Sequence, residues 1–195
     1  GLKRSINSGN IVVEKGAKFT AETRIGGVCG LPDSGNLVDL TNTGDINISG
    51  TFSGRLCVGG ALGYSSCTVG SSDIGCHTSG DITITSDVSS TQLILGGVAG
   101  LIKGAIRNSS NTGNIEIASS HNAMVRVGGI IGWVHLGGVN TVANSGNITV
   151  KSTAKFTTSP VQLAGGIGIN EKTTTKLINT GTITVENGAE LITDA

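Results

Sequence analysis

The chain has 195 residues, of which 32 are glycine and only 3% are aromatic, yet 37% are hydrophobic. This composition is too apolar for a disordered Gly/Ser linker, and the length allows one sizeable core. Thirteen basic residues balance thirteen acidic ones, and they are scattered, so the chain lacks the basic stripe typical of nucleic-acid-binding proteins. No apolar run reaches the roughly 18 residues that a membrane-spanning helix needs.

A seven-residue motif recurs six times, and its central glycine returns every 33 to 36 residues. Within each copy, inward apolar residues alternate with mostly polar ones, which is typical of a strand with one buried face. We expect Ile46, Ile82, Ile115 and Ile148 to stack as buried equivalents. The copies are NSGNIVV at 7–13, NTGDINI at 42–48, TSGDITI at 78–84, NTGNIEI at 111–117, NSGNITV at 144–150 and NTGTITV at 179–185.

The segment after each strand varies in length and behaves like a corner. It contains all three phenylalanines, Phe19, Phe52 and Phe156. Variable length at one place, with fixed motifs elsewhere, is how a solenoid accommodates insertions. The residue that opens each seven-residue motif predicts a polar ladder at a turn. Its members are Asn7, Asn42, Thr78, Asn111, Asn144 and Asn179.

A second strand precedes a double-glycine motif that occurs five times, as GGVCG at 26–30, GGALG at 59–63, GGVAG at 96–100, GGIIG at 128–132 and a degraded GGIGI at 165–169. Pairs such as Leu93/Leu95 and Val125/Val127 are expected to point inward. The residues expected on the outer face of this strand are Arg24, Cys57, Ile94, Arg126 and Leu163.

These repeats predict an all-β fold, a parallel β-helix or β-solenoid of about five to six coils with a repeat of 33–37 residues. A single copy cannot bury its strands, but stacked copies can pair them in parallel about 4.8 Å apart. An up-and-down barrel or a sandwich would not require equivalent residues at this spacing. We expect one domain over residues 1–195, and we expect it to be a fragment of a larger surface protein.

The motifs together resemble the GLUG-type repeat, in which GGxxG is followed by an aromatic or apolar residue and then by an N-x-x-x-[ST]-G-[ND]-[IV] strand. The best matches are GGVAGLIKGAIRNSSNTGNIEI at 96–117 and GGALGY at 59–64. The resemblance covers nearly the whole chain and implies a β-helix-like fold in bacterial, Bacteroides-like, cell-surface or secreted proteins. It transfers no active site.

Two patterns resemble catalytic motifs. The double glycines are flanked by strands, whereas a phosphate loop leads into a helix. Asp45 and Asp81 occupy one repeat position in adjacent coils, about 5 Å apart, a separation that suits a retaining glycosidase or a shared calcium ion. The alternative is that both only finish a turn, as Asn10 and Asn114 do at the same position. We favour that alternative and expect no catalytic residues.

Tyr64 and Trp133 share a repeat position two coils apart, in one column with Leu31 and Leu101. Aromatic rings so placed stack against sugars, or else they seal a corner of the coil. Arg24 and Arg126 lie outward on the adjoining strand and would donate hydrogen bonds to sugar hydroxyls or carboxylates. These two aromatic residues and two arginines are the candidate binding residues, together with the variable loop between residues 64 and 78.

Cys29, Cys57, Cys67 and Cys76 follow no zinc-ligand spacing. The alternatives are four small buried thiols, which we favour, or a Cys67–Cys76 disulfide in an exported protein. His77 beside Cys76 gives little support for a metal site. We therefore expect no metal and no cofactor.

The sequence thus favours a non-catalytic, extracellular cell-surface module, either a rigid spacer or an adhesin that presents a ligand-binding face. Its expected partners are host or bacterial glycans or surface proteins, and neighbouring domains of the same polypeptide. One alternative is a carbohydrate-active β-helix, a lyase or glycosidase, with Asp45 and Asp81 as its acids. A remote alternative is an ice-binding protein, because Thr83, Thr149 and Thr184 share an outward column.

Overall fold

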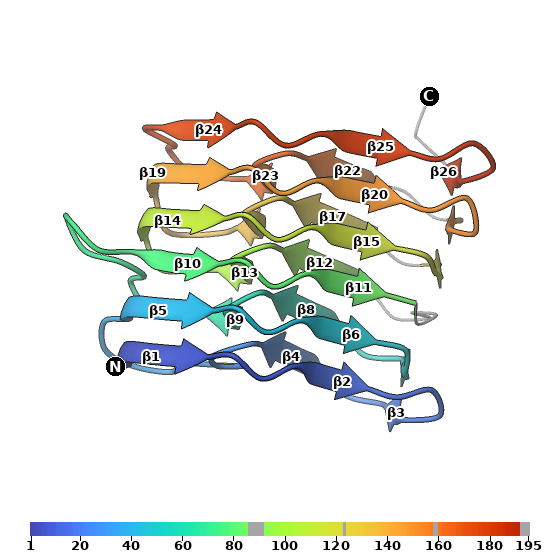
Figure 1. Cartoon of the computed structure of the whole chain (residues 1–195), viewed down its shortest axis with the longest axis horizontal. Coiled ribbons are helices and arrows are strands. Elements are labelled where there is room, and N and C mark those ends of the chain that lie inside the picture. The colour runs from blue at the N-terminus through green and yellow to red at the C-terminus, as the bar shows by residue number, and fades with distance from the viewer. Residues whose placement is uncertain (86–91, 123, 158–159, 192–195) are drawn as a thin grey trace.

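The computed structural model describes residues 1–85, 92–122, 124–157 and 160–191, and within these ranges there are strands but no helix. The strands pair in parallel, and the chain winds through about five stacked turns of a β-solenoid (Figure 1). The predicted fold class is confirmed. In the described part of the chain, no helix has the length and apolarity needed to cross a membrane.

The described strands form sheets that we name A to E in the order in which the chain meets them. Sheets A and B form the front of the solenoid in Figure 1, and every turn adds one strand to each. Sheet A contains β1 (Lys3–Asn7), β5 (Val38–Asn42), β10 (Cys76–Thr78), β14 (Ile106–Asn111), β19 (Val139–Asn144) and β24 (Leu177–Asn179). Sheet B contains β2 (Ile11–Val13), β6 (Ile46–Ile48), β11 (Ile82–Ile84), β15 (Ile115–Ile117), β20 (Ile148–Val150) and β25 (Ile183–Val185).

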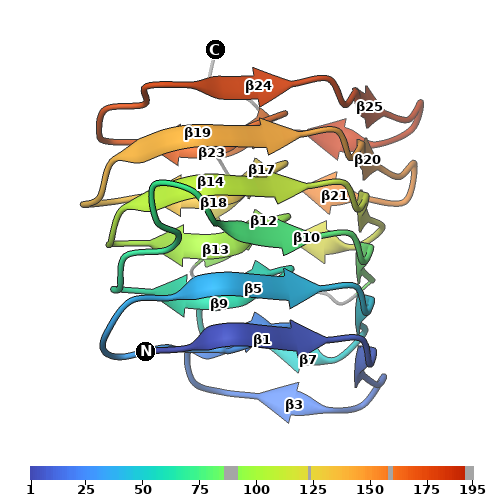
Figure 2. The same ribbon diagram turned by 60° about the vertical axis from the view of Figure 1, so that its left-hand side comes forward.

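The remaining sheets turn the corner and return along the back. Sheet C is built from two-residue strands in two groups, β3 (Lys18–Phe19) with β7 (Thr51–Phe52), and β16 (Ser120–His121) with β21 (Lys155–Phe156) and β26 (Glu190–Leu191). Sheet D contains β4 (Thr23–Gly26), β8 (Leu56–Gly59), β12 (Gln92–Gly96), β17 (Met124–Gly128) and β22 (Val161–Ala164). Sheet E contains β9 (Leu62–Ser65), β13 (Ala99–Ile102), β18 (Ile131–Val134) and β23 (Ile167–Asn170), and it lies behind sheet A (Figure 2).

The isoleucine ladder of sheet B has the predicted register. Ile82 pairs with Ile46 on one side and with Ile115 on the other, and Ile115 pairs with Ile148. All four side chains are buried. They pack against the inward residues of sheet D, and the phenylalanines of sheet C close this core. Phe19 and Phe52 stack there with ring centroids 4.7 Å apart.

The predicted asparagine ladder forms and divides the interior into two cores. Asn42 donates from Nδ2 to the carbonyl of Gly44 at 2.7 Å and accepts at Oδ1 from Asn7 at 2.7 Å. Asn111 repeats this arrangement with Asn144, at 3.0 Å. Thr78, which takes the place of asparagine in the third coil, donates to Asn111 Oδ1 at 2.8 Å and so joins the ladder of the coils above it. One core lies between sheets B and D, and the other lies between sheets A and E.

The second glycine of the double-glycine motif faces this ladder across the solenoid. A Cβ at Gly97 would lie 2.4 Å from the Asn111 side chain and 2.2 Å from the Gly129 carbonyl oxygen, and a Cβ at Gly129 would lie 2.4 Å from Asn144. No side chain fits at these separations, so glycine is required where the front and the back of the coil approach each other. The cross-section therefore has a narrow waist at this point.

One sequence assignment is wrong by a single residue. In the fifth copy, Gly128 pairs with Ala164, so the glycine column continues as AGGIG at 164–168 rather than as GGIGI at 165–169. Leu163 therefore pairs with Val127 on the inward face, and Gln162 takes the outward position next to Arg126. Because side chains alternate along a strand, a one-residue slip moves every side chain to the other face.

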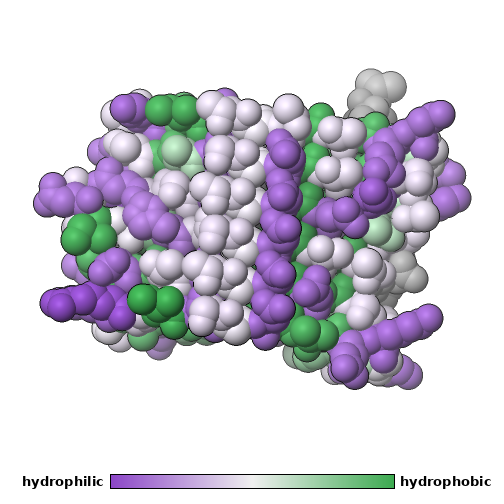
Figure 3. Space-filling model, in the orientation of Figure 1, coloured by the Kyte–Doolittle hydropathy of each residue, from purple (hydrophilic) through white to green (hydrophobic). Residues whose placement is uncertain are grey.

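A second ladder, of asparagine and aspartate side chains, runs along the front between sheets A and B. Asn10 Oδ1 accepts the backbone N–H of Asp45 at 2.9 Å, and Asp45 accepts that of Asp81 at 2.9 Å. Asp81, Asn114 and Asn147 continue the series, which ends at the N–H of Thr182. This front ladder forms a continuous hydrophilic column on the surface (Figure 3).

Candidate functional site

The four candidate binding residues lie together on the back of the solenoid. Tyr64, Leu101 and Trp133 pair in order along the outer side of sheet E, as predicted. Arg24 and Arg126 belong to one outward column of sheet D, in which Cys57 and Ile94 lie between them. The two columns pack against each other, since Cys57, Ile94 and Leu101 form one buried cluster flanked by the two aromatic rings. We call this surface the arginine–aromatic face.

At one end of this face, Arg24 lies over the ring of Tyr64, with its Cζ 5.0 Å from the ring centroid. The Nζ of Lys103 is 5.6 Å from the same centroid. Glu22 Oε1 accepts from Arg24 at 2.9 Å and from Arg55 at 2.7 Å. Burial on its own would raise the pKa of the Glu22 carboxyl, but the hydrogen bonds from Arg55 and Arg24 outweigh burial and lower it. Arg24 is therefore held by a carboxylate and an aromatic ring together.

At the other end, Arg126 covers Trp133, with its Cζ 4.0 Å from the ring centroid. Arg126 is only 8% exposed, and this burial lowers the pKa of its guanidinium. Trp133 Nε1 donates to Glu171 at 2.9 Å, and His135 Nδ1 lies 2.8 Å from the other oxygen of the same carboxylate. The hydrogen bond with His135, assisted by the one from Trp133, lowers the pKa of Glu171.

The rings of Tyr64 and Trp133 are thus each covered by an arginine of the same chain. A cation–π contact is strongest where the cation is partly removed from water, as Arg126 is. Arg24 and Arg126 occupy the ring faces that they cover, and Leu101 packs between the two rings. The arrangement seals the junction of sheets D and E and leaves the Arg24 guanidinium and the Glu22 and Glu171 carboxylates partly exposed at its rim. Ligand binding by these four residues stays a prediction.

Asp45 and Asp81 are adjacent, but both carboxylates serve the front ladder. Asp45 Oδ1 accepts the N–H of Asp81, and Asp81 Oδ1 accepts both the N–H of Asn114 at 2.7 Å and its Nδ2 at 3.2 Å. Asparagine side chains make the same backbone bond in neighbouring coils. Aspartate here does what asparagine does, which supports the turn interpretation. The described residues contain no group of three or more His, Cys, Asp or Glu placed to hold a metal ion.

The four cysteines are free thiols, so a Cys67–Cys76 disulfide does not form in this structure. Burial raises the pKa of the Cys57 and Cys76 thiols to about 12 in each case. Both are therefore protonated at neutral pH and poor nucleophiles. His77 points outward, and its Nδ1 lies 2.8 Å from the hydroxyl oxygen of Ser110 in the next coil. The burial of Cys57 and Cys76 and the hydrogen bond of His77 are typical of residues with a structural role.

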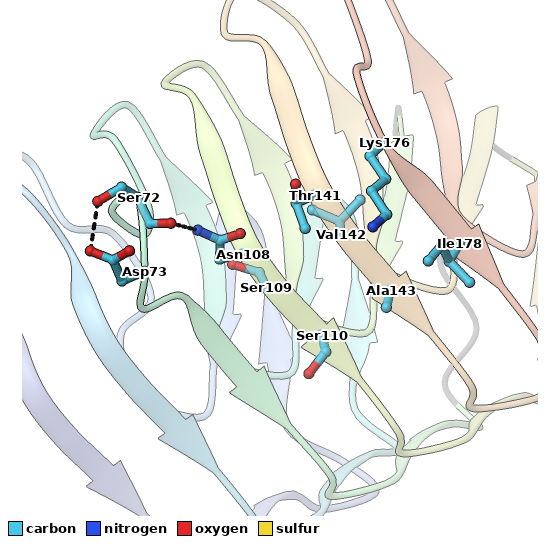
Figure 4. A pocket seen from close by; sticks show the side chains of 10 residues that line it. All are labelled: Ser72, Asp73, Asn108, Ser109, Ser110, Thr141, Val142, Ala143, Lys176 and Ile178. Atoms are coloured by element: carbon cyan, nitrogen blue, oxygen red, sulfur yellow. Dashed lines mark hydrogen bonds between the residues drawn. The ribbon is translucent and has the colours of Figure 1, made fainter.

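A groove on the front, over sheet A, was not assigned from the sequence. It has a volume of about 490 Å³ and is bordered by the loop before β10, by β14 and β19, and by the segment that leads into β24 (Figure 4). Its lining combines Asp73, Asn108 and Lys176 with hydroxyl and apolar groups. The only sequence signal was the extra length of the segment between residues 64 and 78. The other residues that line the groove are far apart in the chain and have no repeat motif of their own.

Comparison with known proteins finds no family model, no curated protein and no solved structure that matches this chain. Functional inference therefore depends on the chain's own geometry. Two surfaces are relevant, the arginine–aromatic face on the back and the groove on the front.

Proposed function

We propose that this chain is a non-catalytic module of an extracellular cell-surface protein, in which it acts as a rigid spacer that presents side chains at fixed intervals. Its partners are glycans or surface proteins and the neighbouring domains of the same polypeptide. The observation that carries the proposal is the continuity of the front ladder through all six copies of the repeat.

The ladders explain why such a stack resists bending. In the asparagine ladder, Asn144 is only 2% exposed, accepts from Asn111 and donates to Asn179 at 2.8 Å. A buried amide that loses such partners costs about 1–3 kcal/mol, so the coils from Thr78 to Asn179 are held together at the waist. The front ladder ties the same coils together at the surface. With about 4.8 Å per coil, outward side chains are repeated on a regular grid.

The extracellular setting is supported by the resemblance to GLUG-type repeats, which occur in arrays in bacterial surface and secreted proteins. The GGxxG motif and the [ST]-G-[ND] strand of that repeat are the residues that build the waist and the front ladder. The likeness therefore lies in architecture, and a structural module is the function it favours. Surface labelling of intact producing cells with an antibody against the chain tests the location.

An activity screen tests the non-catalytic role. Purified protein is assayed on polygalacturonate, alginate, chondroitin and nitrophenyl glycosides, and we expect no turnover. The control is the Asp45→Asn, Asp81→Asn double variant, which keeps the front ladder because asparagine supplies the same acceptor oxygen. Turnover by the wild type that disappears in this folded variant would establish the carbohydrate-active alternative instead.

A further inference from the structure

The groove on sheet A arises where an insertion meets a bulge of the repeat. Arg4, Asp39, Asn108 and Thr141 occupy one column of sheet A and have φ values of 47° to 60°. This left-handed conformation is costly for residues other than glycine, most of all for β-branched threonine. Its presence in four coils makes the bulge a feature of the repeat, and each bulge forms a step on the sheet surface.

In the third coil, the bulge is expanded by four residues, 71–74. Gly70 bonds to Leu37 of the coil below, and Cys76 resumes the regular pairing with Leu40. The inserted loop, seen before β10 in Figure 2, is fixed by side chains rather than left loose. Asn108 Nδ2 donates to the carbonyl oxygens of Ser71 at 2.9 Å and Ser72 at 2.6 Å. The loop thereby becomes one firm wall of the groove.

The floor consists of small side chains and the far wall is charged. Ser110 and Ala143 are half-buried residues of the outward column, and Val142 lies beside them. Lys176 extends from the far side toward this floor, and Ile178 flanks it (Figure 4). The floor is therefore shallow and partly apolar, with a cation over it.

Polar groups at the rim of the groove can still form hydrogen bonds or ion pairs with a ligand. Asp73 Oδ2 accepts from the Ser72 hydroxyl at 2.8 Å. Neither Asp73 nor Lys176 forms an ion pair within the ranges that the structure describes. Asn108 uses both N–H groups on the loop, which leaves its Oδ1 as an acceptor on the groove side.

The shape, charge and lining of the groove favour one class of ligand. The inner strands of sheet A are paired on both sides, so an extended peptide has no free strand edge to join. A single lysine is too little charge for a nucleic-acid backbone. Hydroxyl, amide and carboxylate groups around an apolar floor suit the hydroxyls and the C–H face of a sugar ring, and a lysine ammonium suits a sugar carboxylate. We propose that the groove binds a short acidic oligosaccharide, with a uronate carboxylate on Lys176 and sugar hydroxyls on Asp73 and Asn108.

This site rests on the proposed function, which includes glycans among the partners, and deepens it by naming an acidic oligosaccharide and the groove that would hold it. It lies on the opposite side of the solenoid from the arginine–aromatic face, since sheet A is at the front and sheets D and E are at the back (Figure 1). Variants at the two surfaces therefore report on different predictions.

Titration with trigalacturonate, followed by backbone amide NMR, tests the proposal. We expect saturable shifts of the amides of Ser109, Ser110, Val142 and Ala143. Lys176→Gln should weaken binding about tenfold, the effect of losing one charged hydrogen bond at a partly exposed site. Lys172→Gln, at another exposed lysine of the same segment that does not line the groove, is the matched control and should bind like the wild type.

A second pair of variants tests the groove without changing charge. Ala143→Trp fills the floor at a half-buried outward position and should abolish binding, whereas Ala143→Ser should retain it. Neutral maltotriose should bind more weakly than trigalacturonate and should not respond to Lys176→Gln. The proposal is overturned if trigalacturonate gives no saturable shifts at millimolar concentration, or if Lys176→Gln and Ala143→Trp, both folded, bind it like the wild type.

Discussion

Sheets A and B lie side by side on the front of the solenoid, yet they differ in regularity. Every strand of sheet B is three residues long, and its inward columns contain only isoleucine and valine. The strands of sheet A vary from three to six residues and include left-handed residues. One coil of sheet A also holds the 71–74 insertion. The isoleucine ladder lies on the inward face of sheet B, and the front ladder lies at the start of its strands. Together they fix the register of sheet B.

The difference shows where this repeat can vary. A change within sheet B shifts residues into or out of the core between sheets B and D, whereas extra residues at the outward bulge of sheet A leave the inward side chains in place. The groove lies at such a bulge. In a solenoid of this kind, the regular sheet therefore maintains the fold, whereas insertions in the neighbouring sheet can form binding surfaces.

The largest expected effect is that of Ile115→Asp in sheet B. It buries a charge without a partner between two coils, which costs several kcal/mol, comparable with the whole stability of a domain. We expect the variant to be unfolded by far-UV circular dichroism. Glu116→Ala changes the outward neighbour on the same strand and should alter stability by no more than about 0.5 kcal/mol. Equal melting temperatures for both variants would refute the register of sheet B.

Asn111→Ala should destabilise by about 2–4 kcal/mol in urea titrations, because Asn144 Oδ1 and the Gly113 carbonyl lose their donor at the buried waist, and Thr78 loses one of its acceptors. Asn111→Thr should cost less, since Thr78 already fills this column in the coil below. Asn7→Ala, at the exposed end of the ladder, is the control for the same side-chain loss. If Asn111→Ala and Asn7→Ala cost the same, the ladder does not hold the waist together.

Deletion of residues 71–74 from sheet A should restore the regular coil at a change of only about 1 kcal/mol, because surface loops contribute little to stability. Its control is deletion of residues 114–117, which removes the front-ladder residue Asn114 together with strand β15 of sheet B and should prevent folding. Thermal melts compare the two. An unfolded 71–74 deletion variant would show that the loop is part of the fold rather than an addition to it.

The smallest effect concerns the arginine–aromatic face. The pKa of Glu171 is lowered in the folded state by its hydrogen bonds from His135 and Trp133. A lowered carboxyl pKa stabilises the fold above the unfolded value of about 4.3, and the contribution is lost as pH falls through the folded pKa. Glu171→Gln should therefore reduce the loss of stability between neutral and acidic pH, measured by urea titration at each pH. An unchanged pH dependence would show that this carboxylate is not held as described.

Much of the fold was predictable from the sequence, because its decisive residues return at a fixed period. Ile82 and Asn111 could be assigned to buried ladders from their repeat position alone, and Tyr64 and Trp133 to one column. The slip at Leu163 arose because the fifth copy has Ala164 in place of the first glycine of the motif. The pair Gly165–Gly166 then indicates a register that is shifted by one residue. Because side chains alternate along a strand, this shift assigns an inward residue to the outward face.

The site was less predictable, because its residues are brought together by the winding of the chain. The cation–π pair of Arg126 and Trp133 joins two sheets, and no sequence spacing indicates that an arginine covers the ring. Glu171 comes from the following coil and carries no motif. The groove likewise needs Asp73 and Lys176, three coils apart, and depends on a bulge that only the backbone conformation shows.

The central claim is that the chain forms one rigid parallel stack, and paired spin labels measure this directly. Ser8, Ser145 and Thr180 are exposed residues of one column beside the asparagine ladder, and cysteines there can be labelled after Cys29→Ser and Cys67→Ser. Label pairs 8–145 and 8–180 should give narrow distance distributions near about 19 Å and 24 Å, four and five coils at about 4.8 Å each. Broad distributions, or two distances that do not differ by one coil, would contradict the account.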